Sequence, residues 1–290
     1  MTRFAWPAGM RCAAVLSFDV DGEAGILGNG AALASRLSLM SQASFGPRVG
    51  VPRILELLAR HGLRGSFFIP GYVADLYPAM VEAVAAGGHE VGHHGYLHEK
   101  VTGLTVEQEA EILARGIEIL RRLTGRTPEG YRAPWWELNP GSPGLILRHG
   151  FRYDSSLMGD DIPYRLETEE GPLLEIPVSW LLDDWEQYAY AADPPMGYVI
   201  ETPAKAVELW TAEFEGMYEY GGCFVLTMHP EWTGRASRVL ALDRLIRHIQ
   251  KFDGVWWATC AEIADFCLRS PQSPPEWKTG RQHHAPRSHR

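Results

Sequence analysis

The chain has 290 residues, 46% of them hydrophobic, which is enough to bury the core of one large domain or two small ones. Its formal net charge of -9 argues against nucleic acid or an anionic membrane as a partner. No apolar stretch approaches the roughly 18 residues of a membrane span, and the N-terminus does not have the pattern of a secretory signal. Because the four cysteines form no Cys-x-x-Cys pair, we expect a cytoplasmic protein in a reducing compartment.

Strand and helix patterns alternate along the whole chain. Strands are predicted at residues 12–16, 63–70, 89–94, 129–134, 151–157, 173–180, 223–229 and 255–259. Helices are predicted at residues 52–61, 77–86, 106–123, 144–149, 203–218, 238–252 and 261–268. This alternation indicates parallel strands joined by crossover helices, an α/β fold whose functional site lies at the carboxyl ends of the strands.

Three segments fall outside this pattern. Residues 24–50 are rich in Gly, Ala and Ser and are expected to form a long functional loop. Residues 181–190 are interpreted either as a lid or interface or as an ordinary surface loop. Residues 270–290 are rich in Pro, Ser and basic residues, so we expect one domain over residues 1–269 followed by a disordered tail.

Polar and aromatic residues follow the predicted strands at the points where those strands end. Asp19 and Asp21 follow the first strand, and residues 93–99 follow the third with three histidines. Later strand ends carry Tyr131, Arg132, Trp135, Trp136, Trp180, Asp183, Asp184 and His229. Since buried carboxylates and imidazoles are costly unless they are paired or bind a metal, these ends together predict a functional site.

The histidines suggest a metal site. His94 and His98 are four residues apart, and with one carboxylate they form a two-histidine, one-carboxylate set that leaves positions for water and substrate. His93 is the alternative to His94. A second carboxylate could accept a proton from water, and a distant histidine could protonate a leaving group, so the pattern predicts metal-assisted hydrolysis.

Four stretches of the chain carry these polar residues. In chain order they are Ser17-Phe18-Asp19-Val20-Asp21-Gly22, then Gly92 to Glu99 with its His-x-x-x-His core, then Arg132-Ala133-Pro134-Trp135, and last Leu226-Thr227-Met228-His229-Pro230. In this order they resemble the motifs of the NodB-homology polysaccharide deacetylase family (carbohydrate esterase family 4). The spacing of the first stretch resembles the branch that contains Helicobacter-type peptidoglycan deacetylase and the allantoinase-like and cyclic-imidase-like enzymes.

The resemblance implies a distorted (β/α) barrel of about seven parallel strands. It implies a divalent metal, expected to be zinc, bound by Asp21, His94 and His98. It also implies that Asp19 is the general base and that Arg132 orients Asp19. His229 would be the general acid, steadied by an acid such as Asp154 or Asp183.

The resemblance also bears on the pocket and on assembly. Trp135, Trp136 and Trp180 would wall the substrate pocket, although core packing is an alternative for Trp180. Tyr131 would lend its backbone N–H to the oxyanion. The branch tends to form homotetramers, so a tetramer or dimer is expected.

Three functions follow from these observations. The first is a metal-dependent hydrolase of non-peptide carbon–nitrogen bonds, a polysaccharide or N-acetyl-sugar deacetylase. The second is a cytosolic cyclic imide or ureide amidohydrolase, because the chain shows neither a secretion signal nor a carbohydrate-binding repeat. The third is a catalytically inactive metal- or sugar-binding module, which is disfavoured because Asp19, Arg132 and His229 are all present.

Overall fold

The computed structural model describes residues 4–197, 199–270 and 275–278, the side chains of 277 and 278 excepted. Among the described residues, seven successive neighbours in the sheet pair in parallel, so the predicted α/β fold with about seven parallel strands is confirmed. In spatial order they are β10 (Cys223–Met228), β1 (Cys12–Asp19), β2 (Ser66–Ile69), β3 (Glu90–His93), β4 (Gly130–Tyr131), β5 (Tyr153–Asp154) and β7 (Gly171–Glu175).

The remaining strands extend or flank this series. β11 (Val255–Trp257) pairs in parallel with the start of β1, whereas β2 pairs with the end of β1. β6 (Tyr164–Thr168) forms an antiparallel hairpin with β7, and β12 (Glu276–Lys278) pairs with β6. β8 (Ala191–Ala192) and β9 (Pro195–Met196) form a separate small hairpin.

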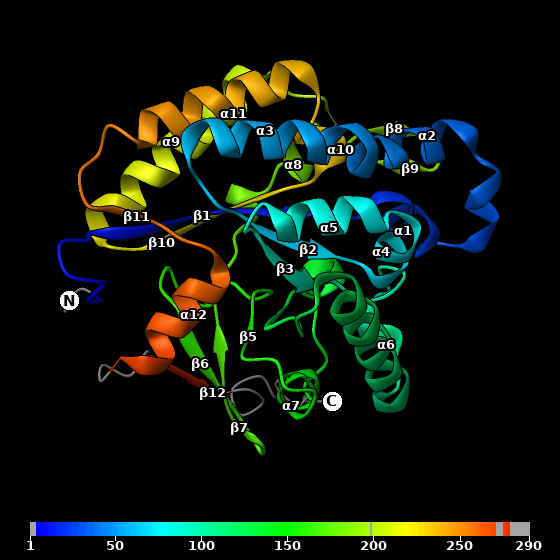
Figure 1. The fold of residues 1–290 in the computed structure, drawn as a ribbon, viewed down its shortest axis with the longest axis horizontal. Helices are drawn as coiled ribbons and strands as arrows, with labels where there is room; N and C mark the ends of the chain where they lie inside the picture. The colour runs from blue at the N-terminus through cyan, green and yellow to red at the C-terminus, as the bar shows by residue number, and fades with distance from the viewer. Residues whose placement is uncertain (1–3, 198, 271–274, 279–290) are drawn as a thin grey trace, which may run out of the picture.

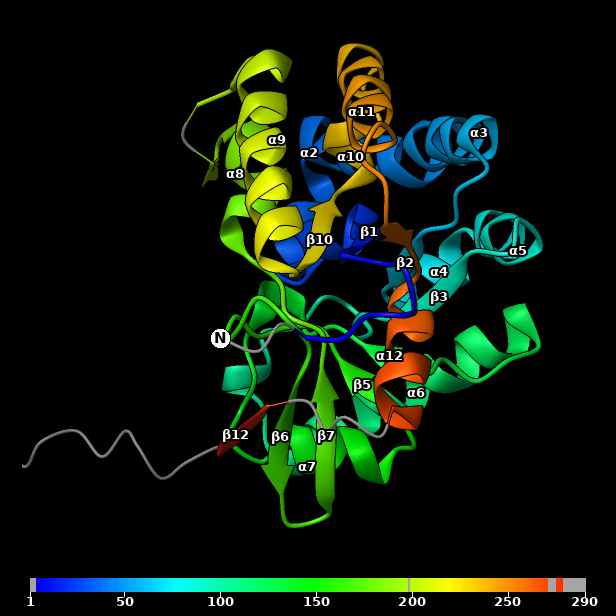
Figure 2. The same ribbon diagram turned by 90° about the vertical axis from the view of Figure 1, so that its left-hand side faces the viewer.

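Helices cover the sheet on both sides. Figures 1 and 2 show α3, α9 and α11 together on one side of β1 and β10, with α6, α7 and α12 on the other side. Among the described residues, no helix has the length and apolar character that crossing a membrane requires. The helices are α1 (Gly22–Leu27), α2 (Leu37–Phe45), α3 (Val51–His61), α4 (Gly71–Leu76), α5 (Pro78–Ala86), α6 (Val106–Thr124), α7 (Ser142–Arg148), α8 (Trp185–Tyr188), α9 (Pro203–Tyr220), α10 (Pro230–Thr233), α11 (Ala236–Ile249) and α12 (Cys260–Arg269).

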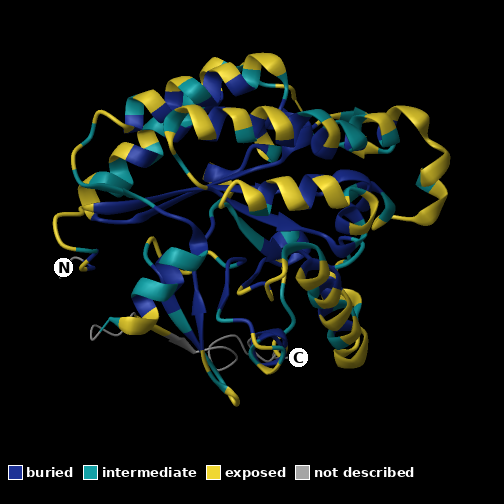
Figure 3. Cartoon of the chain, viewed as in Figure 1, coloured by how far each residue is buried: buried dark blue, intermediate teal, exposed yellow. Residues whose placement is uncertain are grey.

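The central strand β1 is buried along its whole length, as expected for a parallel strand covered on both faces (Figure 3). Its apolar residues alternate between two core clusters, with Leu16 and Phe18 on one side and Ala13 and Val15 on the other. Asp19 is the last residue of this strand. The core therefore holds the first acidic residue of the site on a rigid element.

Residues 24–50 were expected to be a loop, and this expectation is wrong. They form α1, the 3₁₀ helix η1 (Ala31–Ser35), α2 and the π-helical turn η2 (Gly46–Gly50). Ile26, Leu39 and Ala43 pack into a small apolar cluster of their own. Packing of this kind, rather than local helix propensity, stabilises short helices, and a Gly- and Ser-rich pattern does not reveal it.

The strands predicted at 151–157 and 173–180 are shorter in the structure, at Tyr153–Asp154 and Gly171–Glu175. Beyond β5 the backbone N–H groups of Ser156 and Leu157 donate to the Glu175 carboxyl instead of a neighbouring strand, which ends the ladder. Sequence reasoning also missed β6. Within the predicted tail, Glu276–Lys278 form β12. Residues 271–274 and 279–290 lie outside the described part of the chain. The division into one domain over residues 1–269 and a tail therefore stays a prediction.

The contact between α6 and β3 gives a test of this packing. Gly116 of α6 lies so close to His93 that an added Cβ would overlap the imidazole, whereas Gly216 of α9 has open space around the same position. We expect Gly116→Ala to destabilise the chain by about 1–3 kcal/mol through overpacking. Gly216→Ala, the matched control, should stabilise it by about 0.5–1 kcal/mol, since alanine is the better helix former.

Urea unfolding of the two variants measures both effects. Equal midpoints for Gly116→Ala and Gly216→Ala would contradict the close approach of α6 to His93.

Candidate metal and hydrolytic site

The carboxyl ends of five parallel strands meet at one cavity of about 120 Å³. Asp19 ends β1, His94 and His98 lie in the loop after β3, and His229 follows β10. The residues that line the cavity are Asp19, Asp21, Gly25, His94, His98, Trp135, Trp136, Trp180, Asp183, Trp185, Glu186, Met196 and His229. The structure therefore brings nearly all of the residues predicted from the strand ends to one place.

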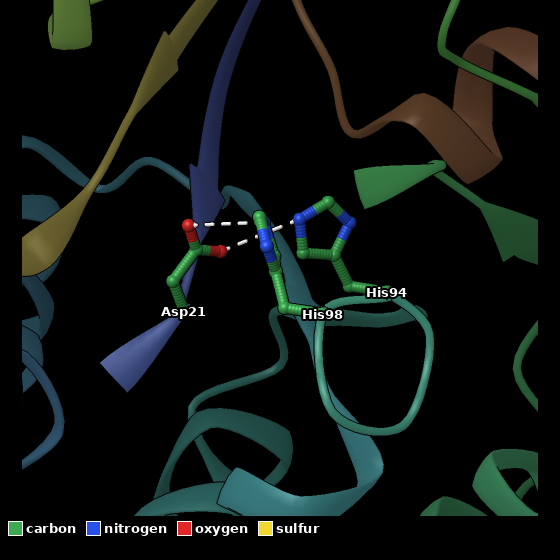
Figure 4. Close-up of side chains that lie close together, drawn as sticks. All are labelled: Asp21, His94 and His98. Atoms are coloured by element: carbon green, nitrogen blue, oxygen red, sulfur yellow. Dashed lines mark ion pairs between the residues drawn. The ribbon is translucent and has the colours of Figure 1, made fainter. Parts of the chain in front are cut away.

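Asp21, His94 and His98 face one another (Figure 4). His94 Nε2 lies 3.3 Å from Asp21 Oδ1, and His98 Nε2 lies 3.2 Å from Asp21 Oδ2. His94 Nδ1 is 2.7 Å from the Arg132 carbonyl oxygen, and because a carbonyl only accepts, this nitrogen carries the proton. The Nε2 of His94 is therefore the ring nitrogen that faces Asp21.

The three residues fit a divalent metal ion. One ligand atom from each lies within 4.8 Å of the others, and all three residues are buried. Asp21 Oδ1 has no hydrogen-bond partner among the described residues, although it is buried. An unpartnered buried carboxylate oxygen is costly, and a cation between it and the two imidazole Nε2 atoms would relieve that cost. Two imidazoles and a carboxylate are ligands that zinc commonly takes.

The electrostatics keep Asp21 ionised. Burial by itself raises the pKa of Asp21, but the neighbouring His98, His94 and His229 outweigh this effect and hold the pKa well below its usual value. Burial lowers the pKa of His94, and the carboxylates of Asp19 and Asp21 outweigh it and raise that pKa. Asp21 thus keeps its negative charge in a buried site, as a cation site requires.

His93, the alternative ligand, points to the opposite side of β3. Its ring packs 5.4 Å from the rings of Tyr131 and Phe151, and its Nδ1 accepts a hydrogen bond from the Gly95 N–H. Burial lowers its pKa to about 3, so it is neutral. Successive side chains of a strand alternate between faces, which explains why His94 reaches the cavity and His93 does not.

Asp19 is held by a fully buried arginine. Arg132 Nη1 donates to Asp19 Oδ1 at 2.8 Å and to Ser17 Oγ at 3.0 Å. The other oxygen, Asp19 Oδ2, lies 4.0 Å from His94 Nε2. One oxygen of Asp19 is therefore bound to Arg132 while the other faces the candidate metal ligands.

His229 is hydrogen-bonded to Asp184; of the two acids suggested from sequence, Asp183 forms a longer ion pair with it and Asp154 binds elsewhere. Asp184 Oδ1 lies 2.8 Å from His229 Nδ1 and accepts the His229 backbone N–H at 2.9 Å. Asp183 Oδ1 is farther away, at 3.5 Å, and Asp154 instead bonds to Ser156. Asp183 and Asp184 are both buried beside His229, and only the folded backbone decides which of them takes the hydrogen bond.

This acid pair also determines the charge of His229. Burial lowers the pKa of the imidazole, but the carboxylates of Asp183 and Asp184 outweigh it and raise that pKa well above its usual value. His229 Nε2 lies 3.8 Å from Asp21 Oδ2, so the protonated ring faces the cavity.

Tryptophans form the wall of the cavity. Trp136 and Trp180 stack with centroids 4.5 Å apart, and Trp180 is 46% exposed, so it lies at the rim and not in the core. The ring centroids of Trp135 and His98 are 5.6 Å apart. The ring centroids of Trp185 and His229 are 5.4 Å apart. Sequence reasoning did not select Trp185 as a pocket residue.

The Tyr131 side chain lies away from the cavity. Tyr131 does not line the cavity, because it lies on the face of β4 opposite to Arg132 and is buried against His93. The role of its backbone N–H stays a prediction.

Backbone strain is concentrated at this site. In the described part of the chain, three non-glycine residues have a positive φ, namely His98 at 55°, Trp135 at 64° and Trp136 at 53°. All three line the cavity. Residues in this region of φ cost about 1–3 kcal/mol each and cluster where function requires a particular side-chain direction.

Known proteins are similar to this chain over most of its length. A profile of the polysaccharide deacetylase family matches residues 45–153. The peptidoglycan deacetylase of Helicobacter pylori is 34% identical over 282 residues, which are 88% of this chain and 96% of that protein. A crystal structure from Mycobacterium smegmatis, of a protein classed with the polysaccharide deacetylases, is 45% identical, covers 95% of this chain and 96% of its own, and has a TM-score of 0.91.

A third similarity concerns the fold alone. The crystal structure of Puue allantoinase is 24% identical, covers 94% of this chain and 96% of its own, and has a TM-score of 0.80.

The fold and these relatives define a hydrolase of carbon–nitrogen bonds on a (β/α)-barrel-related fold. The chain belongs to the polysaccharide deacetylase family, as the order of its four motifs predicts.

The metal ligands can be tested by binding alone. We expect His98→Ala and Asp21→Asn to weaken zinc binding by more than about 100-fold, since even indirect contacts to a metal are worth 10–100-fold. Zinc titration of the chelator-treated chain by calorimetry measures the change. His248→Ala, at a partly exposed histidine on α11, is the control and should bind zinc as the unaltered chain does. Unchanged binding in His98→Ala would contradict the assignment.

Proposed function

We propose that this chain is a metal-dependent hydrolase that removes the acetyl group from an N-acetylated sugar unit of a polysaccharide. The observation that carries the proposal is the meeting of three groups in one cavity: the Asp21–His94–His98 set, the Asp19–Arg132 pair and the Asp184–His229 pair. The names of the relatives point to the same chemistry, since the Helicobacter pylori protein is a peptidoglycan deacetylase.

The metal would be held by Asp21, His94 and His98, and zinc is the expected ion. A bound zinc ion supplies positive charge that lowers the pKa of a water molecule and polarises a carbonyl group. The buried and ionised Asp21 supports this part of the proposal.

Asp19 acts in this proposal as the general base that accepts the proton of the attacking water. Support comes from its free oxygen facing His94 and from its other oxygen accepting a hydrogen bond from Arg132. A carboxylate fixed in this way keeps one orientation and loses little freedom during the reaction.

His229 acts as the general acid that protonates the departing nitrogen. Its Nδ1 bonds to Asp184, so its Nε2 is the nitrogen that faces the cavity with a proton. The raised pKa of the imidazole supports this role, because the ring is protonated before the amine leaves.

The tryptophans support a sugar as the substrate. Trp180 is half-exposed at the rim and stacks on the buried Trp136, and an aromatic face of this kind offers a large apolar surface to the C–H face of a sugar ring. A carbohydrate amide is therefore the proposed substrate class. The homo-oligomer and the cytoplasmic location stay predictions.

A second candidate function is the hydrolysis of a cyclic imide or ureide. The size of the cavity favours it, since about 120 Å³ is small beside the roughly 300–1,000 Å³ of typical ligand pockets. The two functions share the same catalytic residues and differ in the substrate.

One experiment separates them. The chain is given an N-acetylglucosamine oligomer, scored by acetate release, and in parallel a small cyclic imide, scored by ring opening, each with and without chelator and added zinc. Acetate release that the chelator abolishes supports the deacetylase. Ring opening alone moves the chain to the second function, and turnover that ignores the chelator overturns metal dependence.

The base has its own test. We expect Asp19→Asn to lower kcat by about 10²–10⁴-fold, because an amide cannot accept the proton, while zinc affinity stays close to that of the unaltered chain. Single-turnover kinetics and zinc titration measure the two quantities. Asp160→Asn, at an exposed acid, is the control. Retained turnover in Asp19→Asn would assign the base to another residue.

A further inference from the structure

A second pair of acids lies beside the cavity but does not line it. Asp154 of β5 and Glu175 of β7 are fully buried, and they stand directly opposite each other in the register of the two strands. Neither contacts His229 or the candidate metal ligands through any hydrogen bond or ion pair in the described structure. The proposed mechanism gives them no role, although burying two carboxyl groups together is costly.

Both acids bind the same short turn, residues 155–157. Asp154 accepts hydrogen bonds from Ser156, at 2.9 Å from its Oγ and at 3.1 Å from its backbone N. Glu175 Oε1 accepts the backbone N–H groups of Ser156 at 2.9 Å and Leu157 at 2.8 Å. The two carboxyl groups therefore fix the backbone of this turn from both sides.

The turn at residues 155–157 holds Arg132 by hydrogen bonds. The Ser155 carbonyl oxygen accepts a hydrogen bond from Arg132 Nε at 2.9 Å, and Ser155 Oγ accepts one from Arg132 Nη2 at the same distance. Ser156 Oγ accepts the backbone N–H of Ala133, the next residue, at 2.9 Å. The edge of the guanidinium opposite to Asp19 is thus bound to a turn that the two acids determine.

Glu175 is the acid of this pair that carries a proton. Burial raises the pKa of both, and the Asp154 carboxylate adds to the effect on Glu175, whose pKa is raised well above its usual value. Burial raises the pKa of Asp154 only to about 6. Glu175 Oε2 has no hydrogen-bond partner in the described structure, so it is free to carry the proton. At neutral pH the pair then consists of one neutral acid and one carboxylate.

We propose that Asp154 and Glu175 are positioning residues that align Arg132 with Asp19 through the turn at residues 155–157. The inference rests on the proposed function in so far as Asp19 is its base. It adds that alignment of this base depends on residues that do not touch the cavity. The neutral partner is Glu175, so an uncharged amide can replace it.

The test compares two substitutions at one position. Glu175→Gln keeps an oxygen for the N–H groups of Ser156 and Leu157 and carries an N–H where the neutral acid carries its O–H, so it should keep kcat close to that of the unaltered chain. Glu175→Leu removes both and should lower kcat by about 100-fold with little change in KM, the size of effect that a small misplacement of a catalytic group produces.

The matched controls are Glu90→Gln and Glu90→Leu. Glu90 is another buried carboxyl group that accepts hydrogen bonds from Ser66, Tyr153 and the backbone of Ala261, but it lies at the opposite end of the sheet. Glu90→Leu should lower the melting temperature without lowering kcat of the folded fraction. An equal loss of kcat in Glu90→Leu and Glu175→Leu would overturn the positioning role.

A second measurement does not depend on activity. The Arg132 Nε–H resonance, assigned in nitrogen-15 spectra by its loss in Arg132→Lys, should exchange slowly with water in the unaltered chain and in Glu175→Gln, and quickly in Glu175→Leu. Slow exchange in Glu175→Leu would overturn the proposal. A chain that neither releases acetate nor opens the ring, but shows the expected exchange pattern, would overturn the proposed function and leave the positioning role supported.

Discussion

Burial of negative charge at the end of β1 is the constraint on which the rest of the site depends. Asp19 and Asp21 are 1% and 2% exposed, and two ionised carboxylates at such depth require compensation from other elements. Arg132, from the end of β4, compensates Asp19, and the two histidines after β3 face Asp21. Each partner belongs to a different strand end, so the site exists only when the parallel sheet is assembled.

The compensation continues outward in layers. Arg132 is itself fully buried and depends on Ser17 and on the turn at residue 155 for its hydrogen bonds, and that turn depends on the carboxyl groups of Asp154 and Glu175. His229 similarly depends on Asp184, which also accepts a hydrogen bond from Thr233. Hydrogen bonds to charged groups in a buried site are strong, and losing one partner of such a bond is costly. Each group in these two series therefore holds the group that it binds in one geometry. The left-handed φ of His98, Trp135 and Trp136 shows that the backbone, too, is held in a costly form where side chains must point into the cavity.

Several features of this protein could be predicted from sequence because they depend on local patterns. Apolar runs such as Cys12 to Leu16 predict buried parallel strands, and Thr105 with Gln108 predicts the capping box that begins α6. Acids, histidines and an arginine after successive strands predict one site, because parallel strands present their carboxyl ends on one face. The motifs in this order, with the spacing of Asp19 and Asp21, predicted the family.

Tertiary structure alone decided the features that depend on which side chain meets which. Residues 24–50 are helical because Ile26, Leu39 and Ala43 pack together, and no local sequence pattern predicts that contact. The choice of Asp184 over Asp183 and Asp154 depends on the backbone position beside Thr227, and the place of Tyr131 depends on the alternation of β4. A sequence specifies the kinds of groups and their order along each strand, whereas the pairing of buried charges is a property of distances between strands, which exist only in the folded chain.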